Sequence, residues 1–513
     1  MRRNRLDVTP DDQFSFAGRW KFFSWTFAAL LVPMLLWSLA SPLGSIPDEP
    51  SHAIRAAAVV RGEIITGAWV RDPSTARADV PAYVAGLTGL TCFAGHPNVT
   101  PSCAHAQTID PDSIVTIGTS AGNNGPLYYA IVGLPTLFLD GDVALYAMRF
   151  VNALLCAVAL AVMIMQLKTL PRSRWAIAGS VIAITPMVLF LSGSVNPNAI
   201  ELASAGALLG TLIALIRAPG GQWVQAERVV LAVAALGLLV NTRSIALLWV
   251  LLIVAGALAF ATSKSLHRLA RRPSTWSLVA LSAAVCVGAI VWYANPTPFA
   301  PNASTTQPTG FGSAIVSMAI RTFDFAGGYV GIFGWLDTPS PAFTLIVWSA
   351  VVVAMILAAF IWGSGRARLA AAGFGAAMVI VPPVTQAILA PQFGYIWQSR
   401  YMLAILLCFL VACGLALDSS FTESILPAKF RTLAAVMIVL LALGQVMSFV
   451  WTLRRYVVGL TGAVSDMLVR PSWQPPLGWL TLSALMAVWA VAASVLLYRA
   501  VVRPTVSTSS AGG

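Results

Sequence analysis

The run FFSWTFAALLVPMLLWSLASPL at residues 22–43 extends for 22 residues without a charged side chain. A helix of about 20 apolar residues crosses the hydrocarbon core of a bilayer, so this run predicts a membrane span. The whole chain of 513 residues is 58% hydrophobic and 10% charged, with a mean hydropathy of +0.80. An ordinary soluble domain carries about 25% charged residues. Most of the apolar surface is therefore expected to face lipid.

Further apolar runs predict eleven more spans, one of them short. The twelve candidates are 22–43, 147–166, 174–193, 198–216, 228–240, 243–262, 276–293, 342–363, 369–389, 401–417, 431–452 and 478–498. The run PLYYAIVGLPTLFL at 126–139 has only 14 residues and contains Pro135. It is expected to form an interfacial or re-entrant helix, because a span needs about 20 residues. The sequence thus predicts an all-α integral membrane protein with about 12 transmembrane helices.

The distribution of Lys and Arg predicts the orientation of these spans. With the N-terminus inside, 20 of the 31 basic residues fall on the cytoplasmic side and 11 outside, as the positive-inside rule requires. Counting 126–139 as a span would move KTLPRSR and SKSLHRLARR outside. Both termini are therefore predicted to be cytoplasmic. Basic residues scattered over short loops also argue against nucleic acid as a partner, despite the net charge of +12.

The loops predict how the chain is divided. Residues 1–21 form a cytoplasmic segment, 22–500 the transmembrane domain, and 501–513 a cytoplasmic tail whose STSSAGG end should be disordered. The first outer loop, 44–146, is the longest and is expected to bear interfacial helices. It holds nine of the 19 acidic residues, between Asp48 and Asp142. The outer segments 294–341 and 453–477 could fold over it.

Two of the six cysteines lie in this first outer loop. Cys92 and Cys103 are separated by ten residues, and a disulfide between them would close a small loop on the oxidising side of the membrane. His96 and His105 flank the pair, so a Cys2His2 metal site is the alternative, although the spacing matches no familiar zinc pattern. The other four cysteines are expected to pack within spans: Cys156, Cys286, Cys408 and Cys413.

The stretch SIPDEPSHAIRAAAVVRGEI at 45–64 places four ionisable side chains within eight residues: Asp48, Glu49, His52 and Arg55. Asp followed by Pro is typical of a helix start. One interpretation is therefore a capped amphipathic helix on the outer membrane surface, with Ile54, Ala57 and Ala58 facing the bilayer. A cap explains Asp48 but not its ionisable neighbours. An aspartate at the headgroup level could also take a proton from a hydroxyl, so a function beyond capping is predicted.

Polar side chains at the outer ends of other spans point to the same membrane face. They are Asn123, Asn124, Asn196, Asn198, Glu201, Asn241, Arg243, Trp335, Asp337, Trp397, Gln398, Arg400 and Tyr401. Taken singly, each fits a turn, an aromatic belt or a snorkelling arginine. Arg243 and Arg400, however, open apolar runs on the side where basic residues are scarce. Arginine donates two hydrogen bonds to a phosphate. Together these residues predict a site for a lipid phosphate beside a general base.

Four stretches in order, IPDEPSHAIRAAAVVRGEI, SVNPNA, GIFGWLDT and WQSRYML, resemble the motifs of a bacterial family of multi-span membrane proteins of unknown function. The resemblance covers about residues 22–452. That family is similar in turn to the GT-C class of membrane glycosyltransferases. NGPLYYAIVG and MRFVNALL fit the end of the first outer loop and the start of the second span, with Gly125 where a first Pro is common in that class.

The resemblance implies a GT-C-like fold and a sugar donor linked to polyprenyl phosphate, used on the outer face of the bacterial cytoplasmic membrane. Asp48 matches the acidic motif and would be the general base, with Glu49 as its rival. His52 and Arg55 would orient the carboxylate or bind phosphate, which Arg243 and Arg400 would stabilise as it leaves. The expected sugar contacts are Trp335, Asp337 and Gln398. The acidic pair could hold a divalent metal ion. An obligatory metal is not favoured, because no second acidic cluster is evident.

Two other functions compete with an inverting transferase acting on a cell-envelope glycan or lipid. A transporter or flippase of a lipid-linked saccharide would place ionisable groups near the midplane of the bilayer, on broken helices in two repeated halves. No halves are evident in the sequence, and Arg149, Glu201 and Arg243 lie toward the outer ends of spans. A non-catalytic assembly subunit is the third possibility.

Overall fold

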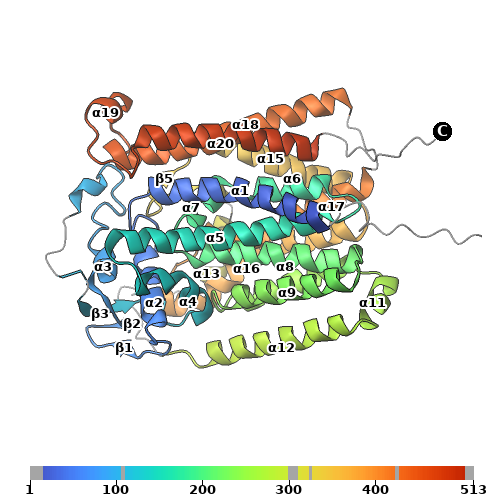
Figure 1. The fold of residues 1–513 in the computed structure, drawn as a ribbon, viewed down its shortest axis with the longest axis horizontal. Coiled ribbons are helices and arrows are strands. Elements are labelled where there is room, and N and C mark those ends of the chain that lie inside the picture. The colour runs from blue at the N-terminus through green and yellow to red at the C-terminus, as the bar shows by residue number, and fades with distance from the viewer. Residues whose placement is uncertain are drawn as a thin grey trace, which may run out of the picture.

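The computed structural model describes residues 16–104, 110–111, 113–297, 310–322, 326–421 and 427–502. Long helices run side by side, and most of the short elements gather at one end of the molecule (Figure 1). Within the described ranges, ten helices are long and apolar enough to cross a membrane, or up to 12 if each of two bent pairs counts as one span. The predicted all-α integral membrane protein with about 12 spans is confirmed. His105 and the tail from residue 503 lie outside the described residues.

The long helices follow the predicted apolar runs closely. They are α1 (Phe16–Ala40), α5 (Gly141–Lys168), α8 (Pro197–Arg217), α9 (Gln222–Val240), α12 (Pro273–Ala294), α15 (Ala342–Ile361), α16 (Gly365–Phe393), α17 (Leu403–Ser420), α18 (Ala428–Val458) and α20 (Trp479–Val501). α8 and α17 form the centre of the bundle, whereas α12 is almost wholly exposed and packs on α9. α18 extends six residues beyond the predicted end at residue 452, so part of the expected outer segment 453–477 is helical.

Two predicted spans are bent. In the run 174–193, α6 (Arg174–Ala183) and α7 (Pro186–Ser192) meet at 67°. Pro186 lacks an amide hydrogen and disfavours a helical conformation at the residue before it, so the helix is interrupted there. α7 begins at Pro186 and is capped by Thr185, whose hydroxyl accepts a hydrogen bond from the Val188 amide. α10 (Ala246–Ala259) and α11 (Ser263–Ala270) meet at 114°, which places α11 in the predicted basic connection.

The first outer loop forms a compact unit at one end of the bundle (Figure 1). It contains α2 (Glu49–Val60), β1 (Ala68–Trp69), β2 (Asp72–Pro81), α3 (Ala82–Ala85), the 3-10 turns η2 (Gly86–Thr88) and η3 (Pro101–Cys103), β3 (Ile114–Thr119), α4 (Pro126–Gly133) and η4 (Leu134–Leu137). The strands make an antiparallel sheet in the order β1-β2-β3, with Ala76 opposite Thr119. This sheet was not predicted, although Ala76, Ala78 and Val80 alternate on its buried face.

The helix α2 does not lie on the bilayer surface as the sequence suggested. Ile54, Ala57 and Ala58 are buried, and α2 packs against α4. The two helices approach so closely that a Cβ at Gly133 would lie 2.2 Å from the Ala56 carbonyl oxygen. α4 and η4 occupy the run 126–139, which is too short to be a span, as predicted. The apolar face of α2 is therefore covered by protein, because α4 folds back onto it.

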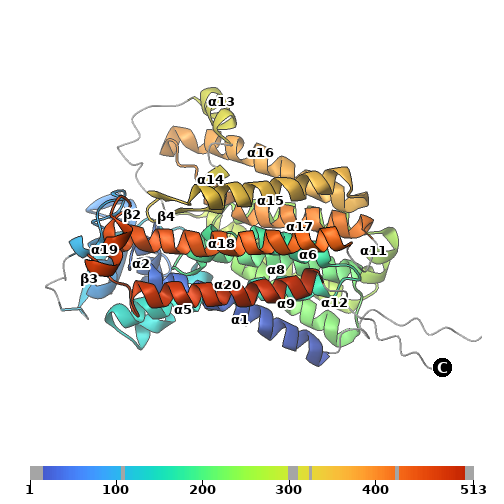
Figure 2. The same ribbon diagram turned by 90° about the horizontal axis from the view of Figure 1, so that it is seen from above.

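The later outer segments contribute α13 (Phe311–Arg321), α14 (Ala326–Val330), the hairpin β4 (Ile332–Phe333) and β5 (Thr338–Pro339), η5 (Ser399–Met402) and α19 (Val464–Val469). α13 lies against α16 on the outside of the bundle (Figure 2). The hairpin is fixed to α1 by aromatic packing, since the rings of Phe333 and Trp37 stack at 5.3 Å. The hairpin thus brings the segment 334–337 to the same end of the bundle as α2.

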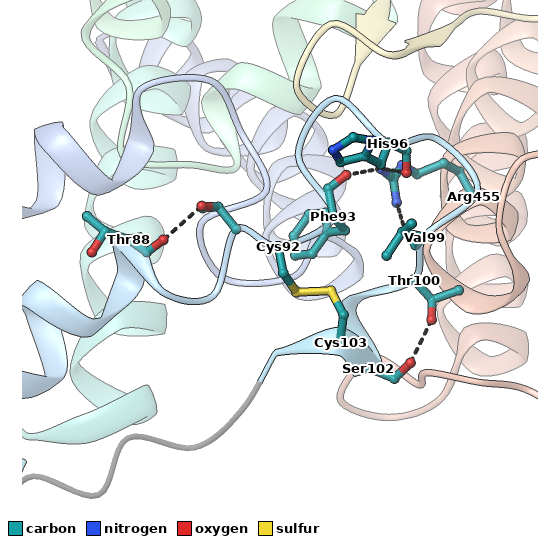
Figure 3. The surroundings of a disulfide bond; sticks show 10 residues. Thr88, Cys92, Phe93, His96, Val99, Thr100, Ser102, Cys103 and Arg455 are labelled. Atoms are coloured by element: carbon teal, nitrogen blue, oxygen red, sulfur yellow. Dashed lines mark hydrogen bonds between the residues drawn. A yellow bond between two sulfur atoms is a disulfide. The ribbon is translucent and has the colours of Figure 1, made fainter.

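Cys92 and Cys103 are joined by the disulfide that the sequence predicts, with Cα atoms 6.1 Å apart (Figure 3). The closed loop is held on α18 by the buried guanidinium of Arg455. It donates hydrogen bonds to the carbonyl oxygens of Phe93 and Val99 at 2.8 Å and of His96 at 3.2 Å. Three hydrogen bonds from Arg455 therefore fix this disulfide-closed loop to the bundle.

Candidate functional site

Asp48 is the residue immediately before α2, but its side chain does not cap the helix. Its backbone is left-handed, with φ 66° and ψ 0°, and its carboxylate makes no capping hydrogen bond. Asp is one of the few residues that tolerates this region. The carboxylate is 47% exposed, and its Oδ2 lies 2.5 Å from Nη2 of the buried Arg400. The cap that both interpretations of Asp48 included is therefore wrong, because the carboxylate binds Arg400 and makes no capping hydrogen bond.

The residues on both sides of Asp48 are held from other helices. The Pro47 carbonyl oxygen accepts hydrogen bonds from Asn196 Nδ2 at 3.2 Å and from Arg400 Nη1 at 3.4 Å. Glu49 is held through its carboxylate by Arg149 of α5. Strained conformations persist only where the surroundings impose them, and they cluster at functional sites. The clamps on its neighbours account for the backbone of Asp48 and direct its carboxylate to a partly open position.

Glu49 is an internal ion-pair partner. Its carboxylate is 3% exposed and accepts from Arg149 Nε at 2.7 Å and Nη2 at 2.6 Å. It also accepts from the backbone amides of Gly44 at 3.1 Å and Val195 at 3.2 Å. The remaining N–H groups of Arg149 donate hydrogen bonds to the carbonyl oxygens of Ser38, Ser41 and Pro42. The partners of both side chains thus come from the protein itself, and this pair joins α1, α2, α5 and the segment just before α8.

Two arginines, Arg243 and Arg400, contact the ring of the same tyrosine, Tyr401. The Arg243 guanidinium is 4.7 Å from the Tyr401 ring centroid, and that of Arg400 is 5.6 Å from it. Arg243 donates to the buried Glu201 from Nε at 3.1 Å and Nη2 at 2.9 Å. Its side chain is 19% exposed, and Nη1 has no hydrogen-bond partner among the described residues. The two arginines predicted to bind a phosphate are thus neighbours, and one of them, Arg400, contacts Asp48.

His52 forms a buried polar contact behind Asp48. Its Nδ1 lies 2.9 Å from the Tyr129 hydroxyl, which accepts a hydrogen bond from Asn124 Nδ2 at 2.8 Å. Burial lowers the pKa of His52 to about 4, and the Asp48 charge only partly opposes this effect. Burial likewise raises the pKa of Tyr129. His52 is therefore neutral at physiological pH and adds no positive charge to the arginines.

Arg55, Asn123 and Asn124 hold loops together. Arg55 donates to the carbonyl oxygens of Glu63 at 3.2 Å, Ile64 at 2.8 Å and Asn124 at 3.4 Å. Asn123 pairs with the backbone of Thr297 through both ends of its amide. Gly125 follows directly, and a Cβ there would lie 2.8 Å from Asn241 Oδ1. This close approach explains why glycine occupies position 125.

Trp335 and Asp337 are engaged by the surrounding backbone and by α18. The Trp335 indole donates to the Gly44 carbonyl oxygen at 3.0 Å. Asp337 is nearly buried and lies 2.8 Å from Nη2 of Arg455, the arginine that also holds the disulfide loop. Of the hairpin residues predicted to contact sugar, Trp335 therefore braces the segment that leads into Asp48, and Asp337 braces Arg455.

Three buried polar atoms near Asp48 lack a hydrogen-bond partner among the described residues: Arg400 Nε, Asn198 Oδ1 and Gln398 Oε1. Asn198 donates through its amide nitrogen to Asn196, the residue that caps α8. Buried polar atoms are almost always paired, so unpaired ones need an explanation. Asn198 and Gln398 lie two residues from Asn196 and Arg400 in the sequence, and both of the latter residues hydrogen-bond to Pro47.

The part of the chain that the structure describes contains no group of three or more His, Cys, Asp and Glu side chains that could hold a metal ion.

Several partners in the site were not predicted from the sequence. Tyr129, Arg149 and Arg455 were not among the predicted site residues. A signal existed for Arg149 and Arg455, because a basic residue on the outer side of a span usually has a partner.

A model of a family of predicted membrane proteins, DUF2142, matches residues 31–409, and the chain belongs to that family. The resemblance to a multi-span family of unknown function is thereby confirmed. Two crystal structures of ArnT from Cupriavidus metallidurans also match, each over 93% of this chain and 77% of ArnT. The apo structure has 15% identity and a TM-score of 0.44, and the one bound to undecaprenyl phosphate 14% and 0.39. A search of curated proteins gave no match.

Proposed function

We propose that this protein is a membrane glycosyltransferase of the GT-C type. It would move a sugar from a polyprenyl-phosphate donor to a glycan or lipid acceptor of the cell envelope, on the outer face of the bacterial cytoplasmic membrane. The observation that carries the proposal is the contact between the half-exposed carboxylate of Asp48 and the buried guanidinium of Arg400. This reaction requires a proton acceptor and a phosphate-binding cation at one place.

The proposed reaction is a single displacement. An acceptor hydroxyl attacks the anomeric carbon of the donor sugar and gives its proton to Asp48. The bond from the acceptor oxygen to that carbon forms as the bond to the phosphate oxygen breaks. Polyprenyl phosphate leaves with the electron pair. Because attack comes from the side opposite the leaving group, the configuration at the anomeric carbon is inverted.

The arginines would stabilise the charge that gathers on the departing phosphate. Among the residues that the structure describes, Arg400 Nε and Arg243 Nη1 have no hydrogen-bond partner, so both arginines retain a donor after making their protein contacts. Fixed donors aimed at developing charge are commonly the largest contribution to catalysis. Tyr401 keeps the two guanidinium groups at a set spacing. Gln398 and Asn198 offer acceptor oxygens to sugar hydroxyls.

The other predicted site residues take positioning roles in this proposal. Glu49 is saturated by Arg149 and two backbone amides, which leaves Asp48 as the base. His52 and Arg55 pack α2 against α4 and its flanking loops. Trp335 supports the chain before Asp48, and Asp337 fixes Arg455, which holds the disulfide loop. No step requires a metal ion.

The test is a transfer assay with purified protein, a panel of radiolabelled polyprenyl-phosphate sugars and a membrane extract as the source of acceptors. We expect the wild type to transfer label from at least one donor and Asp48→Asn to transfer none. Asp466→Asn is the matched control, because Asp466 is an exposed carboxylate of α19 at the same end of the molecule.

Two results would contradict the proposal. Equal transfer by Asp48→Asn and the wild type would remove Asp48 as the base. Absence of transfer from every donor, together with movement of a labelled lipid-linked saccharide across proteoliposomes that contain the wild type, would instead establish the transporter. The stereochemistry of the product, read by NMR, separately tests the predicted inversion.

A further inference from the structure

A cleft separate from the Asp48 contact opens on the outer unit. It has a volume of about 460 Å³, within the 300–1,000 Å³ range that is usual for ligand sites. Its walls come from the end of α1, the first outer loop, the start of α5 and the segment between α19 and α20. Four distant parts of the chain thus meet around one hollow.

Aromatic rings dominate three of these walls. Tyr83 comes from α3, Tyr146 from α5 and Trp473 from the segment before α20. All three are partly exposed. Rings with one apolar face and a polar edge suit a ligand that has both apolar and hydroxyl surfaces. A pyranose ring has this composition, with C–H groups on its faces and hydroxyls around its rim.

The charge of the residues that line the cleft restricts the class of ligand further. Among the described residues that line the cleft, Asp142 is the single charged one. The nearby Arg149 lies 5.7 Å from the Tyr146 ring centroid, but its donors are spent on Glu49 and on three carbonyl oxygens. A carboxylate accepts hydrogen bonds from hydroxyls and repels anions. The lining therefore fits a neutral saccharide and disfavours a uronic acid or a phosphate.

The walls are rigid before any ligand arrives. Phe93, Pro101 and Ala104 line the cleft beside or within the loop that the Cys92–Cys103 disulfide closes. Arg455 binds the carbonyl of Phe93, and the rings of Tyr456 and Trp473 pack edge to face at 6.2 Å. The Tyr83 hydroxyl donates to the Leu139 carbonyl oxygen at 3.2 Å. Preformed walls reduce the entropy lost on binding.

The cleft is close to the proposed base along the chain. Leu43 lines it and is five residues before Asp48, so their Cα atoms are at most about 18 Å apart. The hydrogen bond from the Gly44 amide to Glu49 shortens this path by folding the segment. An oligosaccharide can extend over such a distance from one place to the other.

We propose that this cleft, lined by Tyr83, Tyr146, Trp473 and Asp142, binds a neutral oligosaccharide. The identification of that saccharide as the acceptor chain rests on the proposed function; binding itself does not. The cleft holds sugar units remote from the reacting hydroxyl, so it selects acceptors by length and charge without contacting the reacting atoms.

Binding is measured by saturation-transfer-difference NMR and calorimetry on the full chain in lipid nanodiscs, because maltoside detergents would themselves present sugars. The probes are mannotriose, galactotriose, maltotriose and, as the anionic comparison, trigalacturonic acid. We expect at least one neutral trisaccharide to bind and the acidic one to bind at least about tenfold more weakly. Absence of binding by every neutral trisaccharide would overturn the proposal.

Variants separate the cleft from the Asp48 site. Trp473→Ala should weaken binding of the neutral trisaccharide at least about tenfold, while Trp473→Phe retains most of it. Trp223→Ala is the matched control, because Trp223 is an exposed tryptophan at the start of α9. Asp48→Asn should bind the trisaccharide as the wild type does. Unchanged binding by Trp473→Ala would refute the cleft.

The outcomes also separate this proposal from the proposed function. Binding that is lost in Trp473→Ala and kept in Asp48→Asn supports the cleft even if no sugar transfer is found. If transfer occurs, Trp473→Ala should lower the rate on a long acceptor more than on a monosaccharide acceptor. Equal effects on both acceptors would refute the assignment of the cleft to the acceptor chain.

Discussion

Asp48 Oδ2 and Arg400 Nη2 lie 2.5 Å apart although 352 residues separate them in the chain. The arginine side chain is 1% exposed, and the aspartate side chain is 47% exposed. One partner is therefore fixed by the protein, and the other remains open to a ligand. The contact also joins the start of α2 to η5, the turn that leads into α17. The following predictions test what this contact and its neighbours do.

Arg400→Lys should lower sugar transfer at least about tenfold with little loss of stability. A lysine ammonium cannot hold the Pro47 carbonyl and the Asp48 carboxylate in one plane as the guanidinium does. Turnover and thermal unfolding are measured on the same preparation. Arg454→Lys is the control, since Arg454 contacts the Gly462 carbonyl and the Trp451 ring, and neither contact involves Asp48. Wild-type turnover in Arg400→Lys would exclude the planar contact from the mechanism.

Glu49→Gln should destabilise the fold by about 3–5 kcal/mol, because it leaves the buried Arg149 charge unpaired. Asp48→Asn should cost about 1 kcal/mol or less, since its carboxylate is half exposed. Thermal unfolding in nanodiscs measures both. The double variant Glu49→Gln, Arg149→Met should regain part of the lost stability. Equal stability of the two single variants would contradict the separate roles assigned to these adjacent carboxylates.

His52 should make the fold less stable in mild acid. Its folded pKa of about 4 is below the ordinary value of 6.5. Between these values the unfolded chain binds the proton and the folded chain does not, so stability falls as pH drops from about 6.5 to 4, by about 3 kcal/mol in total. His52→Gln should flatten the dependence of the melting temperature on pH over this range. An unchanged slope in that variant would mean that His52 is not the group responsible.

Cysteine labelling tests the predicted orientation of the spans. Ser173 in the basic connection after α5 is buried, but its neighbour Pro171 is exposed. Pro171→Cys should therefore resist an impermeant maleimide on intact cells and react after lysis. Thr88→Cys, exposed in the first outer loop, should react on intact cells. The opposite pattern would place Asp48 on the cytoplasmic side.

The spans were predictable because their signal is local. Twenty apolar residues in a row identify a helix in lipid without knowledge of its neighbours, and α5, α8 and α15 begin and end within six residues of the predicted limits. The bend at Pro186 could have been expected from proline alone. The outer sheet of β1, β2 and β3 was not predicted, because β1 has only two residues and the alternation in β2 is a weak signal.

Several residues of the candidate site could be singled out from the sequence, but which side chains pair with each other could not. Asp48, Arg243 and Arg400 were singled out because ionisable groups are scarce at a membrane boundary. Nothing in the sequence states that Arg149 pairs with Glu49, or Arg455 with Asp337, because those contacts depend on how distant helices pack. Exposed and buried carboxylates also look alike in a sequence. The burial of α2 was mispredicted for the same reason: an apolar helical face fits lipid and protein equally.

The most direct test of the account is single-turnover sugar transfer by Asp48→Asn, with donor binding measured on the same sample. The account predicts that the variant binds the polyprenyl-phosphate sugar with unchanged affinity and transfers it at least about a hundredfold more slowly, because the proton acceptor is gone while both arginines remain. Transfer at the wild-type rate from a fully bound donor would contradict it.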